Sequence, residues 1–161
     1  MTTASPRNET WQSWSRRLAD ELRALSDGGW LTLSIQPARD APPTDVPTRG
    51  WRRLRRRAGR MPPGRLPAPS EAFVQVRLLE GRLALECIAD TQFEGVSDLT
   101  DAQQRRLVDL GWEQDGREPS FSRTFEPVEH YAEQAAGLLT ATVRDVLGAP
   151  APDAVELRRP C

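Results

Sequence analysis

The spacing of apolar positions predicts an amphipathic helix near the start of the chain. Apolar side chains recur there every three or four residues, at Trp11, Trp14, Leu18, Leu22 and Leu25. Charged side chains occupy most of the positions between them, which is the pattern of a helix with one buried face. We expect Asn8 to cap this helix and Gly28 to end it.

One apolar face, formed by every second residue, predicts strands over 30–36, 73–79 and 82–89. The turn at Glu80-Gly81 makes the last two a hairpin. One face of these strands is apolar throughout. The opposite face is a mixture that includes Trp30, Phe73, Gln75, Arg77 and Ile88. We interpret this second face either as a partly covered back of the sheet or as a binding surface.

The residues after the hairpin predict a helix, a second hairpin and a final helix. Thr100 and Gln103 form a capping-box pair, and Gly111 stands where the helix that follows them would end. Segments 112–114 and 120–126 then read as a hairpin, and a final helix is expected between Pro127 and Gly148. Helices that flank antiparallel hairpins, without alternating βα units, predict an α+β fold.

A segment rich in arginine and proline interrupts this pattern. Residues 37–70 hold eight prolines and nine arginines, a composition that cannot bury enough apolar surface to offset its ordering entropy. We expect a single domain over 8–148, with 37–70 as a flexible insert within it. Residues 149–161 are expected to form a C-terminal tail.

The charge of the chain is unevenly distributed. All 22 basic side chains are arginine, and they face 23 acidic ones, for a net charge of −1. The absence of lysine excludes Schiff-base and P-loop lysine chemistry. The basic excess of the first half of the chain lies in the insert.

The arginines of the insert leave several interpretations open. A helix that is basic over most of its surface could form there on contact with a partner. The partner could be nucleic acid, an anionic membrane surface, or the acidic half of a protein or of another copy of the chain. The segment could also be a solvated insertion. The candidate side chains for binding a polyanion through residues 49–65 are Arg52, Arg53, Arg55, Arg56, Arg57 and Arg60.

No pattern of residues names a reaction. His130 is the single histidine, so neither a histidine-rich metal site nor two-histidine acid–base catalysis is available. The sequence has no GxSxG elbow and no glycine-rich phosphate loop. Cys87 and Cys161 are expected to be free thiols. We therefore predict a protein that is not an enzyme and that has no metal and no cofactor.

The ends and the hydropathy of the chain bear on its location. Residues 1–10 have no apolar core, and no apolar stretch reaches the length of about 18 residues that a membrane-spanning helix needs. We expect a cytoplasmic protein without a transmembrane segment.

Four short motifs resemble the TY-Chap family. They are Phe73–Val76, the helix start Leu99–Gln104, Leu110–Trp112 and Ser120–Phe125. The family consists of chaperone-like, peptide-binding domains of high-GC bacteria, grouped with type III secretion chaperones such as CesT and with YbjN-like proteins. The similarity extends from about Trp11 to Gly148, apart from the insert.

The resemblance implies an α-β-β-β-α-β-β-α fold that holds a partner polypeptide in an extended form, often as a homodimer. An extended partner can pair with a free sheet edge, while apolar pockets beside that edge give selectivity. The candidate peptide-binding residues are Trp30, Phe73, Gln75, Arg77 and Ile88. Trp112, Phe121 and Phe125 are expected to lie in the core. The insert departs from the family pattern and leaves open whether the edge beside the first strand is free.

Overall fold

The computed structural model describes residues 2–3, 9–35, 72–88, 99–114 and 120–159. Along the chain these form β1 (Thr2–Thr3), α1 (Trp11–Arg23), β2 (Trp30–Ile35), β3 (Phe73–Leu79), β4 (Arg82–Ile88), α2 (Asp101–Asp109), β5 (Glu113–Gln114), β6 (Phe121–Phe125), α3 (Val128–Ala141), a π-helical turn η2 (Thr142–Val146), a 3-10 turn η3 (Pro152–Ala154) and β7 (Val155–Arg158). The α+β class is confirmed. The insert expected at 37–70 lies outside the described residues, and so do its six candidate arginines.

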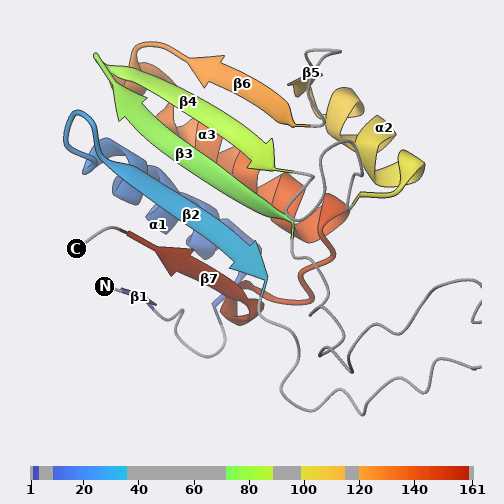
Figure 1. Cartoon of the computed structure of the whole chain (residues 1–161). Coiled ribbons are helices and arrows are strands. Elements are labelled where there is room, and N and C mark those ends of the chain that lie inside the picture. The colour runs from blue at the N-terminus through green and yellow to red at the C-terminus, as the bar shows by residue number, and fades with distance from the viewer. Residues whose placement is uncertain (1, 4–8, 36–71, 89–98, 115–119, 160–161) are drawn as a thin grey trace, which may run out of the picture.

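One antiparallel sheet organises these elements. Its strand order is β1-β7-β2-β3-β4-β6-β5. Helices α1 and α3 lie side by side against one face of this sheet, and α2 lies beside β5 at one end (Figure 1). Within the described ranges, no helix covers the opposite face.

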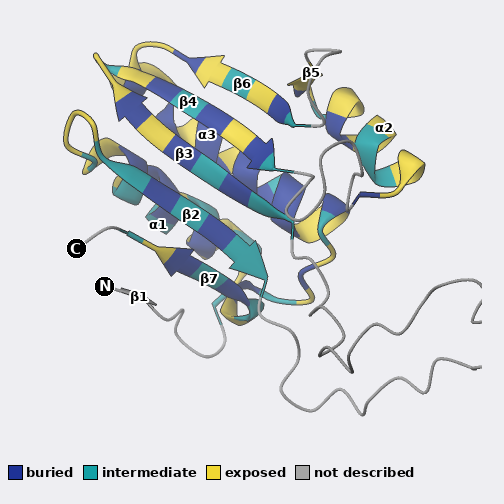
Figure 2. Ribbon diagram, in the orientation of Figure 1, coloured by how far each residue is buried: buried dark blue, intermediate teal, exposed yellow. Residues whose placement is uncertain are grey.

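Burial alternates along the central strands as the sequence predicts (Figure 2). The side chains that face the helices are fully buried, among them Leu31, Leu33, Val74, Val76, Leu83 and Leu85. They pack against Trp14, Leu18 and Leu22 of α1 in the main core cluster. Because side chains on a strand alternate between faces, the residues between these positions lie on the helix-free side.

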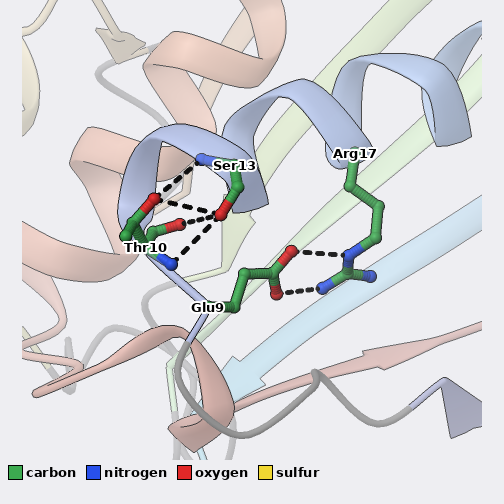
Figure 3. A network of polar contacts seen from close by, with 4 residues as sticks. All are labelled: Glu9, Thr10, Ser13 and Arg17. Carbon is green, nitrogen blue, oxygen red and sulfur yellow. Dashed lines mark hydrogen bonds and ion pairs between the residues drawn. The ribbon is translucent and has the colours of Figure 1, made fainter.

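Helix α1 begins at Trp11, two residues later than the expected cap at Asn8 would place it. Thr10 is the N-cap: its Oγ1 accepts from the backbone N–H of Ser13, and Ser13 Oγ accepts from the N–H of Thr10 (Figure 3). Arg17 donates two hydrogen bonds to Glu9, at 3.0 and 2.8 Å. This reciprocal cap satisfies two of the N–H groups that a helix start leaves free.

The expected C-terminal tail is wrong as far as residues 155–158 are concerned. They form β7, which pairs with β2 on one side and β1 on the other. Val155 and Leu157 are buried, whereas Arg158 is exposed. The segment after Gly148 therefore supplies a strand of the sheet.

The helix–turn–hairpin block agrees with the sequence analysis. Thr100 and Gln103 form the expected capping box of α2. β5 and β6 form the expected pair, and the turn between them lies outside the described ranges. Trp112, Phe121 and Phe125 are all buried, as expected for core residues. α3 begins after Pro127 as expected, but its last part is the π-helical turn η2.

Candidate binding face of the sheet

All five predicted binding residues lie on the helix-free side of the sheet. We call this side the open face, and it carries outward side chains of β7, β2, β3, β4 and β6. The strand register brings the candidates together: Trp30 pairs with Arg77, and Phe73 pairs with Ile88. Gln75 stands between Phe73 and Arg77 on β3. Two residues far apart in the sequence, Trp30 and Arg77, are thus direct neighbours.

The open face is neither core nor plain solvent surface. Trp30, Phe73, Gln75 and Ile88 are half-buried, and Arg77 is exposed. Large aromatic side chains in this intermediate state are typical of binding surfaces, because they keep apolar area available to a partner. The mixture of apolar and polar residues in the sequence therefore corresponds to a mixed, partly exposed surface in the structure.

A first hollow lies along β2 on this face. It has a volume of about 360 Å³ and is lined by Trp30, Thr32, Ser34, Phe73 and Arg158. Thr32 and Ser34 have small side chains, and the larger aromatic side chains lie beside them. Volumes of about 300 Å³ and more are usual for ligand pockets. The geometry suits an apolar side chain of a partner.

A second, smaller hollow lies on the other side of β3. Its volume is about 160 Å³, and its lining consists of Gln75, Arg77, Ala84, Leu85, Glu86, Ser122 and Thr124. The small residues here are Ala84 and the two hydroxyl side chains of β6. The long side chains of β3 therefore stand as a ridge between the two hollows.

Ion pairs neutralise part of the charge on and beside this face. Arg158 Nη2 lies 2.7 Å from Glu156 Oε2, and Arg82 Nε lies 2.9 Å from Glu126 Oε2. Arg77 and Glu86 both line the second hollow, and the structure shows no ion pair for either within the part of the chain it describes. The face therefore offers one positive and one negative group in the same place.

Three residues of the first hollow were not among the predicted binding residues. Thr32 and Ser34 alternate with the buried Leu31 and Leu33 and so share the mixed face with Trp30. Arg158 was not predicted because residues 149–161 were expected to form a tail. The alternation of Val155, Glu156, Leu157 and Arg158 is a strand signal, although a short one.

The edges of the sheet bear on how a partner could bind. β7 pairs with β2 at four positions, from Thr32 to Ile35, so the edge beside the first predicted strand is occupied. At the other edge β5 pairs with Phe121 and Ser122 of β6 only. Strand addition along Thr32–Ile35 of β2 is therefore blocked.

A larger hollow lies apart from the open face, between α2 and the β5–β6 pair. Its volume is about 540 Å³. It is lined mainly by polar and charged residues, namely Asp101, Gln104, Arg105, Val108, Asp109, Gln114 and Phe121. None of the predicted binding residues lies there.

Cys87 points into the core from β4, under the open face. Burial raises the pKa of its thiol to about 12, and the negative charge of Glu86 adds to the effect. Because the thiolate is the reactive form, this side chain is a poor nucleophile. Among the described residues no group of His, Cys, Asp or Glu side chains could hold a metal ion. None of the described helices is long and apolar enough to cross a membrane.

Comparison with known protein families gives a match over nearly the whole chain. A family model described as "T3SS (YopN, CesT) and YbjN peptide-binding chaperone 3" matches residues 4–161. The matched range includes β7 as well as the four motifs of the sequence analysis. No curated protein and no solved structure matches the chain significantly.

Proposed function

Because the chain belongs to the TY-Chap3 family of peptide-binding chaperone domains, we propose that its open face holds an extended segment of a partner polypeptide without catalysing a reaction. The observation that carries this proposal is the meeting of Trp30, Phe73, Gln75, Arg77 and Ile88 on one helix-free face, beside two hollows.

The chemistry of the face suits a peptide better than a small reactive substrate. The half-buried aromatic side chains of Trp30 and Phe73 offer apolar contact that the described part of the chain does not cover. Gln75, Ser122 and Thr124 offer donors and acceptors for peptide groups. Apolar anchors surrounded by polar groups are the usual composition of a protein–peptide contact.

The proposal is tested with a displayed library of random nine-residue peptides selected on the immobilised protein. Affinities of enriched peptides are then measured by fluorescence anisotropy for the wild type and for Phe73→Asp. A charge at Phe73 puts a desolvated carboxylate against the apolar part of the partner, so we expect at least about tenfold weaker binding.

Val108→Asp is the matched control. It also replaces an apolar side chain by a carboxylate, but at an exposed position on α2 and away from the open face. We expect it to leave the affinity unchanged, and circular dichroism should show that both variants are folded. Equal affinity of the folded Phe73→Asp variant, or no enriched peptide at all, would overturn the proposal.

Three finer predictions of the sequence remain predictions. Binding of nucleic acid or of an anionic surface rests on Arg52, Arg53, Arg55, Arg56, Arg57 and Arg60, which lie outside the described residues. Homodimer formation and a cytoplasmic location rest on the resemblance and on the sequence. Light scattering across micromolar concentrations tests the homodimer directly.

A further inference from the structure

The two hollows of the open face differ in chemistry, and the difference bears on which partner sequence they accept. The first hollow carries two aromatic side chains, Trp30 and Phe73. Its arginine, Arg158, is already paired with Glu156 at 2.7 Å. A charged guest would therefore lose its hydration without gaining an unpaired counter-ion, whereas an apolar guest gains burial.

The second hollow carries both signs of charge. Arg77 and Glu86 line it together with the amide of Gln75 and the hydroxyl groups of Ser122 and Thr124. A carboxylate guest would meet Arg77 but also Glu86. A basic guest would meet Glu86 but also Arg77. Either charge is therefore attracted and repelled by the same site.

An uncharged amide satisfies both groups at once. Its NH₂ can donate to the Glu86 carboxylate while its carbonyl accepts from the Arg77 guanidinium. Both bonds are charge-assisted on the side of the protein, and the guest itself carries no charge to desolvate. Asn and Gln carry the donor and the acceptor on two separate atoms of one planar amide, whereas a Ser or Thr hydroxyl must use a single oxygen for both bonds.

One short segment can reach both hollows. The first is centred on β2 and the second on β4, and β3 lies between them. Strands in a sheet are about 4.8 Å apart, so the two strands on which the hollows are centred are about 10 Å apart. This separation lies between about 7 and 13 Å, the spacings at which side chains two and four positions apart in an extended segment face the same way.

On the basis of the proposed function, we infer that the partner segment places an apolar side chain in the hollow beside Trp30 and Phe73, and an Asn or Gln side chain in the hollow between Arg77 and Glu86. The open face would thus select its partner by an uncharged polar side chain near an apolar one, and not by net charge.

The test continues from the displayed library. We expect the enriched peptides to share an apolar residue with Asn or Gln a few positions away. In one such peptide the amide residue is replaced by Glu and, separately, by Lys. Both analogues should bind the wild-type protein about five- to tenfold more weakly, because each brings a like charge close to Glu86 or Arg77.

Two protein variants should change this preference in opposite directions. Glu86→Gln removes the group that repels a carboxylate, so the Glu analogue should recover most of its affinity while the Lys analogue should not. Arg77→Met removes the group that repels an ammonium, so the Lys analogue should recover most of its affinity while the Glu analogue should not. Glu129→Gln is the control, because it removes the charge of an exposed glutamate on α3. It should leave the preference for the amide peptide over its Glu and Lys analogues as it is in the wild type.

The outcomes separate this inference from the proposed function. If Phe73→Asp abolishes peptide binding but the Gln, Glu and Lys peptides bind equally, the inference is overturned and the proposed function stands. A charge preference that neither Arg77→Met nor Glu86→Gln alters also overturns the inference. If the library yields no binder, both are overturned.

Discussion

The indole N–H of Trp112 donates a hydrogen bond to Oγ1 of Thr142 at 2.9 Å in the core. The Thr142 hydroxyl in turn donates to the carbonyl of Leu138 at 2.8 Å. The bond joins the turn that follows α2 to the point where α3 becomes the π-helical turn η2. It thus fixes α2 and the turn after it to the end of α3, although Trp112 and Thr142 are 30 residues apart in the sequence.

We predict that this pair is energetically coupled. Trp112→Phe leaves the buried hydroxyl without its donor, and Thr142→Val leaves the indole N–H without its acceptor. A double-mutant cycle by urea denaturation should give a coupling of about 1 kcal/mol, because removing both partners leaves neither group unsatisfied. Simple additivity of the two losses would contradict the prediction.

A second prediction concerns the capping box of α2. Gln103 accepts from the N–H of Thr100 and also donates from Nε2 to the carbonyl of Val146 at 2.8 Å. Ser13 has the same capping position in α1, where its hydrogen bonds join it to Thr10. Gln103→Ala should therefore destabilise the fold more than Ser13→Ala, by about 1 kcal/mol in urea denaturation. Equal losses would show that the bond to Val146 is not stabilising.

A third prediction concerns the pH dependence of stability at high pH. The pKa of the buried Cys87 thiol is raised from 9.0 to about 12, so the folded protein disfavours the thiolate. The contribution to stability is complete below pH 9 and is lost as the pH rises toward 12, because the unfolded chain ionises first. The chain has no lysine, so few other groups titrate in this range.

The measurement is the free energy of unfolding between pH 8 and about 11, in a Cys161→Ser background that leaves one thiol. We expect it to fall with pH in that background and to fall less when Cys87 is also replaced by Ala. A thiol reagent should leave Cys87 unmodified in the folded protein and modify it in urea. Equal slopes with and without Cys87 would contradict the assignment.

A fourth prediction separates the two sequence-based hypotheses about binding. Deleting residues 49–65 should leave peptide binding intact, because the open face lies on the strands. Any affinity for duplex DNA or anionic vesicles should be lost with the same deletion, and in the full chain it should weaken steeply with salt. If the deletion also abolished peptide binding, residues 49–65 would have to contribute to the binding of the peptide.

The central sheet and its open face could be predicted because alternation is a strong signal in strands of this length. Along β3, from Phe73 to Leu79, every second side chain is buried as its polarity suggests. That single pattern assigned Phe73, Gln75 and Arg77 to one face. It could not show that Trp30 stands beside Arg77, since strand order is set by tertiary packing.

Other features had weaker signals in the sequence. β7 has only four residues, and the prolines before it favoured a tail. Without β7, Arg158 could not be placed in the first hollow. The cap of α1 was misplaced because Asn8 and Thr10 are both good N-caps, and the Thr10–Ser13 pair lacks the usual Glu or Gln. The π-helical turn at Thr142 has no pattern that we recognise.

The pairing of Ile35 with Val155 has a consequence for how the protein is made. β2 leaves the ribosome long before β7 does, and until then its backbone N–H and C=O groups have no partner on that edge. Contacts this distant in sequence slow folding and leave a strand edge open to other chains. During synthesis this chaperone-like domain therefore passes through a state in which the edge of β2 is open to pairing with other chains, and β7 closes that edge only at the end.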